Sequence, residues 1–493
     1  MVGQIINHLA YFAIIVLLAT SVPAAHLGDL DATQNTVIII GFLGTWRYSW
    51  AMINFTRAVI FRRLVYPRKK AAAFARYRAE GWRSHAYFLV TSYMVEPEVT
   101  IPVYRSLFLA AAEASNGATI VASVVDGADE RLIREIFHSM PCDMSSVQLS
   151  VDRIAANGKR DALAKTLRII DGFCPTARDI VVFVDGDTCV PQDIVAQAAP
   201  MFTDPNVGAL TTDEAVVIEK KNLFRDWFIM RFNQRQVMMC SMGLSNRVLT
   251  LTGRMSVFRA DLATRPGFVN GIRNDYLDHW RLGRVNFLTG DDKSTWYWLL
   301  KNGYEMAYLP DVQSHSMETQ PKPTFLGSAQ VLMVRWFGNM MRTNGRALGQ
   351  SPRKIGYFTW WSILDQRVSM WTTLAGPITV MLAAALYSVS VIPLYIAWVM
   401  ATRYLFCVII SVFRGQWFPV SHPLILYFSQ VAGAAVKTFV FFRLDKQKWT
   451  RQSSGAAVSV AALSQRIRAF ESSAHHVLAL TWLTVAIMFF TKV

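Results

Sequence analysis

Apolar residues gather at the two ends of the chain, whereas the middle shows the mixed pattern of a folded domain. Two apolar runs, at 5–22 and 36–55, are each long enough to cross a bilayer. A cleavable signal peptide is excluded for the first run, because no positive charge precedes it and a second run follows. Later apolar runs occupy 371–411, which is long enough for two spans, 423–442, and the shorter 477–490. The pattern predicts a multi-pass membrane protein with a central folded domain.

The charges between the apolar runs predict how the chain is oriented. The connection after the first run contains Asp29 and Asp31 and neither lysine nor arginine, and a basic cluster follows the second run, namely Arg57, Arg62, Arg63, Arg68, Lys69 and Lys70. Since basic loops stay in the cytoplasm, the N-terminus and the central domain are predicted to lie there. Two spans in 371–411 and a third at 423–442 would place the basic stretch 443–471 outside, against this rule. Either 423–442 lies in the membrane interface, or the number of spans differs.

The central region alternates between strand and helix patterns. Residues 87–93, 119–125 and 180–184 read as strands, and 103–114 has helical character. This alternation predicts an α/β domain with a mostly parallel sheet covered by helices on both faces. Beyond about residue 325 the chain turns amphipathic, which is typical of helices that lie in a membrane interface.

The predicted strand 180–184 runs directly into Asp185-Gly186-Asp187. Ligands of open α/β sheets bind beyond the carboxyl ends of the strands. Two carboxylates in that place suit Mg²⁺ or Mn²⁺, which would neutralise the phosphates of a bound nucleotide. An Asp-x-Asp turn is common on protein surfaces, but here a buried strand leads into it. The pair therefore predicts a metal and nucleotide site.

Other groups of chemical interest follow a fixed order along the same region. They are Asp126 at the end of a strand, Gly158-Lys159-Arg160, Thr252-Gly253-Arg254, Gly290-Asp291-Asp292 and Arg335-Trp336. The glycine before Lys159 allows a backbone to approach a ligand, and the lysine can meet a phosphate or base. A carboxylate of the Asp291-Asp292 pair can serve as a general base. Each segment read alone also fits a solvated turn or a helix cap.

Composition and charge narrow the functional classes. The chain has 493 residues, of which 53% are hydrophobic, and its net charge is +16. No basic–aromatic reading module accompanies the charge, so a nucleic-acid partner is not expected. Basic loops beside the spans account for much of the charge, and an anionic substrate or product suits the remainder. The five cysteines show no paired or zinc-binding spacing, so we expect free thiols.

The ordered motifs resemble those of the processive family-2 glycosyltransferases, which include cellulose, chitin and hyaluronan synthases. The resemblance covers about residues 87–340 and implies a GT-A-type domain. It implies that Asp126 contacts the nucleotide base and that Lys159 and Arg160 lie at the nucleotide. It also implies that Asp185 and Asp187 bind the metal and the nucleotide sugar.

The same resemblance implies roles at the acceptor side. Asp292, beside Asp291, matches the base that takes a proton from the acceptor hydroxyl in an inverting transfer. Arg335 matches the arginine that meets the diphosphate, and Trp336 matches the floor of the acceptor site. Gly253 belongs to a loose version of the acceptor segment.

A later segment resembles the cytoplasmic gating loop of the same enzymes. Residues Trp449, Thr450 and Arg451 match its Trp-Gly-Thr-Arg pattern except for the missing glycine. A second departure is Leu332, where the Gln-x-x-Arg-Trp motif has glutamine. These departures argue against a standard cellulose or hyaluronan synthase.

Within the family the chain resembles the catalytic subunits of bacterial alginate synthases. The resemblance implies GDP-mannuronate as donor and β-1,4-linked polymannuronate as a product that crosses the inner membrane. It also implies a cyclic-di-GMP-binding co-polymerase and other envelope secretion proteins as partners. The alternatives are a synthase that uses a UDP-sugar, a membrane enzyme that adds one sugar to a lipid carrier, and a catalytically inactive scaffold.

Three cations lie in or near the apolar runs, namely Arg47, Arg403 and Lys437. Charge is expensive there and usually functional, so we expect some of them to line the exit path of a charged polymer. Snorkelling to the interface is the alternative.

These observations predict six segments. They are two transmembrane helices in 1–60, the cytoplasmic catalytic domain in 61–324, interface helices in 325–370, transmembrane helices in 371–442, a gating loop and interface helix in 443–475, and a final transmembrane helix in 476–493.

Overall fold

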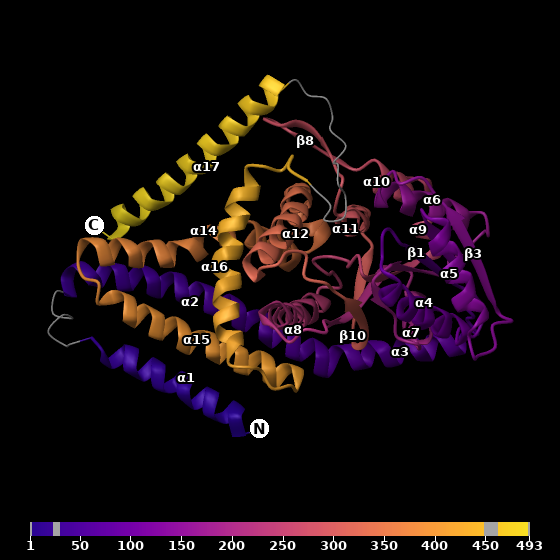
Figure 1. The fold of residues 1–493 in the computed structure, drawn as a ribbon, viewed down its shortest axis with the longest axis horizontal. Helices are drawn as coiled ribbons and strands as arrows, with labels where there is room; N and C mark the ends of the chain where they lie inside the picture. Colours follow the sequence, from indigo (N-terminus) through magenta and orange to yellow (C-terminus); the bar gives the residue numbers. More distant parts are fainter. Residues whose placement is uncertain (1, 23–29, 448–461, 492–493) are drawn as a thin grey trace.

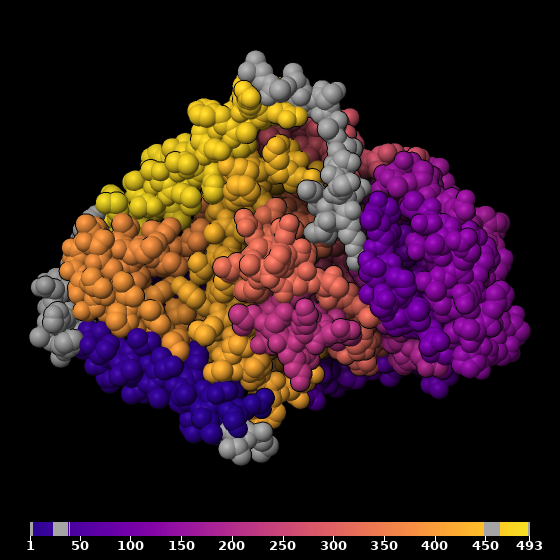
Figure 2. Space-filling model, viewed as in Figure 1, coloured from indigo at the N-terminus to yellow at the C-terminus, as the bar shows by residue number. Residues whose placement is uncertain are grey.

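The computed structural model describes residues 2–22, 30–447 and 462–491. An α/β domain lies at one end of the molecule, on the right in Figure 1, and long apolar helices lie at the other. In Figure 2 the N-terminal helix and the orange and yellow C-terminal helices lie together, apart from the purple part of the α/β domain. The predicted gating residues Trp449, Thr450 and Arg451 fall outside the described part of the chain.

The α/β domain is built on an eight-stranded sheet with the strand order β3-β2-β1-β4-β7-β6-β10-β5. The strands β3, β2, β1 and β4 run parallel, and so do β6 and β10, whereas β7 is antiparallel to both of its neighbours. The strands are β1 (Ala86–Thr91), β2 (Ala118–Val124), β3 (Val147–Arg153), β4 (Ile180–Asp185), β5 (Thr188–Cys189), β6 (Val207–Val217), β7 (Met255–Arg259) and β10 (Glu305–Met317). The three strands predicted from apolar runs are thus confirmed as β1, β2 and β4.

The central strands consist of apolar, largely β-branched residues because helices cover both of their faces. All residues of β2 are buried, and so are the first five of β4. A separate hairpin, β8 (Tyr276–His279) and β9 (Gly283–Asn286), extends from the domain towards the membrane helices. The domain helices are α3 (Tyr66–Ala79), α4 (Pro97–Ala112), α5 (Gly127–His138), α6 (Lys159–Asp171), α7 (Ile194–Ala198), α8 (Leu223–Gly243), α9 (Ala260–Ala263), α10 (Pro266–Arg273) and α11 (Asp291–Lys301).

Among the described residues, five helices are long and apolar enough to cross a membrane, by length and composition alone. They are α1 (Val2–Thr20), α14 (Tyr357–Leu386), α15 (Val391–Arg414), α16 (Ser421–Phe441) and α17 (Ala462–Thr491). The second predicted span forms helix α2 (Leu30–Ile60), which is not among these five. It nevertheless lies beside α14 in the same bundle.

Helix α16 does not run with the other apolar helices but crosses them steeply (Figure 1). At its start, Ser421 Oγ donates to Asp226 Oδ2 of α8 at 2.7 Å. Just past its end, Arg281 of the hairpin donates to the carbonyl of Phe442 at 2.7 Å. Both partners belong to the α/β domain, so both ends of α16 lie on the side of that domain. Of the two alternatives for 423–442, the structure favours the interface.

Several predicted boundaries fall inside continuous helices. The amphipathic helix α12 (Phe325–Leu348) begins where expected, and the short α13 (Pro352–Ile355) follows it. The boundary at 370/371 lies within α14, and the boundary at 475/476 lies within α17. A change from polar to apolar residues does not mark the end of a helix, because polar and apolar residues both adopt helical geometry.

A buried ion pair joins the eight-stranded sheet to the apolar helices. Arg414, at the end of α15, donates to Asp213 Oδ2 of β6 at 2.6 Å, and both side chains are almost fully buried. Tyr308 and Gln313 of β10 donate to the same carboxylate at 3.2 and 2.9 Å. The carboxylate is therefore fully hydrogen-bonded, as a buried charge requires.

Candidate active site

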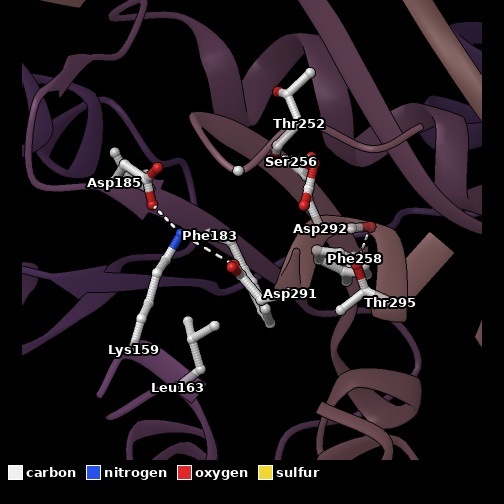
Figure 3. A pocket seen from close by; sticks show the side chains of 12 residues that line it. Lys159, Leu163, Phe183, Asp185, Thr252, Ser256, Phe258, Asp291, Asp292 and Thr295 are labelled. Carbon is white, nitrogen blue, oxygen red and sulfur yellow. Dashed lines mark hydrogen bonds and ion pairs between the residues drawn. The ribbon is translucent and has the colours of Figure 1, made fainter. Parts of the chain in front are cut away.

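A pocket opens at the carboxyl end of β4, where the sequence predicted a ligand site (Figure 3). Five residues singled out from the sequence line it together, namely Lys159, Asp185, Gly253, Asp291 and Asp292. These residues come from four separate segments of the chain, which the sheet brings to one edge. The other lining residues are Leu163, Phe183, Val184, Thr252, Ser256, Phe258 and Thr295.

Lys159 holds two carboxylates together at the centre of this pocket. Its ammonium lies 2.6 Å from Asp185 Oδ1 and 2.9 Å from Asp291 Oδ2, as the dashed lines in Figure 3 show. Lys159 is the first residue of α6, and Gly158 before it has a φ of +107°, a conformation that few other residues adopt. The turn thus aims the lysine into the pocket.

Asp291 and Asp292 occupy the first turn of α11, where the helix dipole favours negative charge. Burial and the neighbouring Asp291 raise the pKa of Asp292 to about 6. Burial would also raise the pKa of Asp291, but Lys159 and Arg160 outweigh it and lower that pKa. Two adjacent carboxyl groups whose pKa values move apart are suited to different roles, and Asp292 is the better proton acceptor near neutral pH.

The turn before these aspartates admits only glycine. Gly290 has a φ of +82°, and a Cβ added there would lie 2.8 Å from the side chain of Asn339 on α12. Gly186, between the two aspartates of the Asp-x-Asp turn, is equally constrained, since a Cβ there would lie 2.4 Å from Ser92 Oγ. The glycines of both acidic motifs are therefore explained by close packing.

Arg160 lies behind the pocket, only 6% exposed. Its guanidinium donates to the carbonyl groups of Ile272 and Thr289 at 2.7 and 2.9 Å, and to Ser294 Oγ at 3.0 Å. These contacts connect α6 to the turn that precedes Asp291. The geometry is that of a residue that positions the acidic turn, and the predicted contact of Arg160 with the nucleotide stays a prediction.

Asp126 lies at the carboxyl end of β2, two strands away from β4 in the sheet. It is exposed, and its Oδ1 accepts a hydrogen bond from the backbone N–H of Ala128 at 3.0 Å, so it caps α5. It is not among the residues that line the pocket. The predicted contact of Asp126 with the nucleotide base stays a prediction.

Gly253 forms the rim of the pocket opposite Lys159. A Cβ at this position would lie 3.4 Å from Asp185 Oδ2 and 3.5 Å from Lys159 Nζ, so a side chain would fill the space between them. The next residue, Arg254, turns away to Glu318, with 2.6 Å between Nη2 and Oε1. The glycine thus keeps the space beside Asp185 open.

Arg335 and Trp336 lie on α12, which packs against α14 and α16, and neither is among the residues that line the pocket. Burial lowers the pKa of Arg335, while Glu318, Asp185 and Asp187 act on it in the opposite direction. The guanidinium is therefore close enough to the Asp-x-Asp turn to interact with it electrostatically. Trp336 stacks on Trp227 of α8, with 5.5 Å between ring centroids.

Two residues near this site escaped the sequence analysis. Arg231 of α8 lies with its guanidinium carbon 4.1 Å from the ring centroid of Trp336. The sequence feature that could have predicted this contact is the position of Arg231 inside an aromatic-rich stretch, Trp-Phe-Ile-Met-Arg-Phe, because such stretches favour cation–π contacts. Lys293, directly after Asp292, is buried and donates to the carbonyl of Leu249 at 2.5 Å, and burial lowers its pKa to about 8.

Within the described residues, no group of three or more His, Cys, Asp or Glu side chains could hold a metal ion by itself. The oxygens of Asp185 and Asp187 nevertheless form a hard donor set, and a cation already fits beside Asp185, as the ammonium of Lys159 shows. Mg²⁺ in proteins is often bound by one or two carboxylates plus substrate phosphates. The residues present fit a metal that arrives with a nucleotide.

The free cysteines agree with the sequence prediction. All five are unpaired, and Cys240 and Cys407 are buried.

Comparisons with known proteins agree with this geometry. A sequence model described as glycosyltransferase like family 2 matches residues 84–339. Glycosyltransferase alg8 of Pseudomonas syringae pv. tomato is 39% identical over 455 residues, which are 92% of this chain and 91% of the relative. Glycosyltransferase alg8 of Azotobacter vinelandii is 39% identical over 458 residues, with the same two coverages.

Among solved structures, the mannosyltransferase PcManGT from Pyrobaculum calidifontis in complex with GDP-Man and Mn²⁺ aligns with 78% of this chain and 98% of its own. The sequence identity is 17% and the TM-score is 0.47. The family match and the two relatives confirm the resemblance to family-2 glycosyltransferases and the GT-A-type fold. The chain belongs to glycosyltransferase family 2 and, within it, to the Alg8 glycosyltransferases.

Proposed function

We propose that this protein polymerises mannuronate from GDP-mannuronate into β-1,4-linked polymannuronate, the precursor of alginate. The observation that carries the proposal is the pocket in which Asp292 lies beside the Lys159–Asp185–Asp291 cluster, in a chain related to Alg8 over 92% of its length. The pocket supplies a proton acceptor next to groups that suit a nucleotide diphosphate. The family relationship supports the choice of sugar.

The transfer would be an inverting displacement at the anomeric carbon. Asp292 takes the proton from the 4-hydroxyl of the chain end, and its raised pKa of about 6 makes it a stronger base than an ordinary aspartate. Arg335 offers planar donors to the diphosphate oxygens. Trp336, already stacked on Trp227, offers an aromatic floor for the acceptor sugar.

A divalent cation fits the same scheme. Asp185 and Asp187 would hold Mg²⁺ or Mn²⁺ together with the diphosphate of the donor. When bound, the metal stabilises the negative charge that develops on the departing nucleotide. Lys159 would then keep Asp291 in place beside the base.

The location and the partners follow from the same proposal. The protein would lie in the bacterial inner membrane with its catalytic domain in the cytoplasm, which the basic segment 57–70 supports. The product would cross the membrane through the helix bundle. A cyclic-di-GMP-binding co-polymerase would supply the regulation.

The test uses membranes that contain the full chain, with GDP-mannuronate and Mg²⁺, and with UDP-glucose and UDP-N-acetylglucosamine as parallel donors. The length of the product is then measured for the parent protein and for Asp292→Asn. We expect a long polymer from GDP-mannuronate alone, and a loss of at least about a hundredfold in its rate with Asp292→Asn.

Other outcomes would contradict parts of the proposal. A polymer made from a UDP-sugar would refute the choice of donor. Transfer of a single sugar to a lipid would refute polymerisation. If the co-polymerase and cyclic di-GMP are added and no donor is consumed, the proposed reaction is wrong, and a role as an inactive scaffold is favoured.

A further inference from the structure

Four cations form a row that leads from the acceptor side of the active site into the helix bundle. We define this cation row as Arg231, Lys437, Arg47 and Arg403, from helices α8, α16, α2 and α15. One carboxylate, Asp365 of α14, accompanies them. Together the four cations and this carboxylate carry a net charge of +3, and Lys437, Arg47 and Arg403 lie on the long helices outside the α/β domain, where uncompensated charge is expensive and usually functional.

The row begins at the predicted acceptor site. The guanidinium carbon of Arg231 lies 4.1 Å from the ring centroid of Trp336 and 5.2 Å from that of Trp227. No carboxylate among the described residues lies within 4.0 Å of this guanidinium. Burial and the nearby Arg254 lower the pKa of Arg231 to about 10, so the side chain stays charged at neutral pH.

Lys437 continues the row towards the membrane helices. Its ammonium lies 5.0 Å from the ring centroid of Phe337, the residue after Trp336 on α12. Arg231, Arg47 and Asp365 all act on Lys437 electrostatically. Within the part of the chain that the structure describes, Lys437 forms no ion pair of 4.0 Å or less.

The last two cations lie among the apolar helices. Arg47 Nη1 is 2.5 Å from Asp365 Oδ1, and Arg47 also donates to Thr372 Oγ1. Arg403 donates to Gln430 Oε1 and to the hydroxyl of Tyr48, both at 3.1 Å. Asp365 therefore neutralises one cation, and the other three have only neutral hydrogen-bond partners or aromatic rings among the described residues.

The row is not sealed inside the protein. All four cations and Asp365 are half-buried and keep part of their surface accessible. Arg414 shows a different arrangement, because it is almost fully buried against the carboxylate of Asp213. Half-buried cations with neutral partners leave room for an anionic ligand.

From this geometry we infer that the cation row binds the carboxylates of the nascent polyuronate as the chain leaves Trp336 and enters the helix bundle. The inference rests on the proposed function, because that function supplies a polymer with one carboxylate on every sugar. Passage requires several sites of modest affinity rather than one strong site. Asp365 serves this need, because it competes with the polymer for Arg47.

Binding of a preformed product tests the inference without turnover. The full chain, purified in lipid nanodiscs, is titrated with a fluorescent oligomannuronate and, separately, with the same oligomer after its carboxylates have been esterified. We expect the acidic oligomer to bind at least about tenfold more tightly than the ester, and rising salt to weaken only the acidic oligomer.

Substitutions then assign this charge dependence to the row. Lys437→Gln with Arg403→Gln should weaken binding of the acidic oligomer about tenfold and remove its advantage over the ester. Lys437→Arg with Arg403→Lys keeps both charges and should retain most of the binding. Arg57→Gln removes a cation from α2 outside the row and is the matched control, expected to bind like the parent. Arg231→Gln, on a helix of the catalytic domain, provides an independent test if the double variant folds poorly.

The outcomes separate this inference from the proposed function. Equal binding of acid and ester to the parent, or unchanged binding in both Lys437→Gln/Arg403→Gln and Arg231→Gln, overturns the inference even if polymer is made. Charge-dependent binding that the substitutions abolish supports it, even if GDP-mannuronate is not the donor.

Discussion

At the scale of single residues, neighbouring charges set the pKa of each carboxyl group and therefore its chemical role. Asp291 and Asp292 are adjacent in the chain, yet Lys159 contacts only the former. The pKa of Asp291 is lowered, and that of Asp292 is raised to about 6. One aspartate stays ionised beside the cation, and the other can exchange a proton near neutral pH.

The first prediction concerns the pH dependence of the transfer. A general base must be ionised, so the rate should rise with pH through a midpoint of about 6 and then level off. Lys293 favours the ionised form of Asp292, so Lys293→Gln should move the midpoint upward by about one pH unit. The measurement is kcat/KM for the donor against pH. Lys301→Gln, at the exposed end of α11, should leave the midpoint in place, and an unmoved midpoint in Lys293→Gln would contradict the assignment of the base.

The second prediction concerns the cation between the two carboxylates. Lys159→Met leaves Asp185 and Asp291 facing each other without a counter-ion, so the free energy of unfolding should fall by about 3 kcal/mol. A divalent cation should restore part of this loss, because it can take the place of the ammonium. Thermal unfolding with and without Mg²⁺, in the absence of nucleotide, measures both effects.

The control for this prediction is Lys165→Met, which removes a surface ion pair to Asp161 on the same helix. Its effect should be below about 1 kcal/mol and independent of Mg²⁺. Equal stabilisation of the Lys159→Met variant and the parent by Mg²⁺ would show that the metal does not bind at these carboxylates.

At the scale of elements, helix α16 shows that the orientation of an apolar helix does not follow from its composition. Its apolar sequence is sufficient for a span, but the contacts of Ser421 and Phe442 hold both of its ends on the catalytic side. The helix also packs against α12, which carries Trp336. An interface helix so placed lies between the catalytic domain and the bundle.

The third prediction tests this orientation. In a variant whose five native cysteines are replaced, a single cysteine is introduced at Gln416 or at Lys446, which flank α16 and are exposed. Both should react with a membrane-impermeant maleimide from the side of the catalytic domain and not from the other side. Labelling of the two positions from opposite sides would mean that α16 crosses the membrane.

At the scale of the whole molecule, the strands and the acidic pocket could be predicted, and the directions of helices could not. The four apolar residues before Asp185 predict a buried parallel strand by themselves, because such a strand needs apolar side chains on both faces. Arg160 illustrates the opposite case, since it follows Lys159 directly but does not line the pocket and donates to the carbonyl of Thr289 behind it. Whether the first or the second residue after Gly158 faces the ligand depends on the direction of the helix that follows. The orientation of α16 could not be predicted either, because the hydropathy of a segment depends on its composition and not on the direction of its helix.

The buried pair of Arg414 and Asp213 has a consequence for how such synthases can be recombined. The guanidinium comes from the last residue of a membrane helix and the carboxylate from a strand of the catalytic sheet. A chimera that joins this catalytic domain to the helices of a family member without this arginine would leave Asp213 buried without its partner. A functional chimera should therefore keep both Arg414 and Asp213, or replace both of them together.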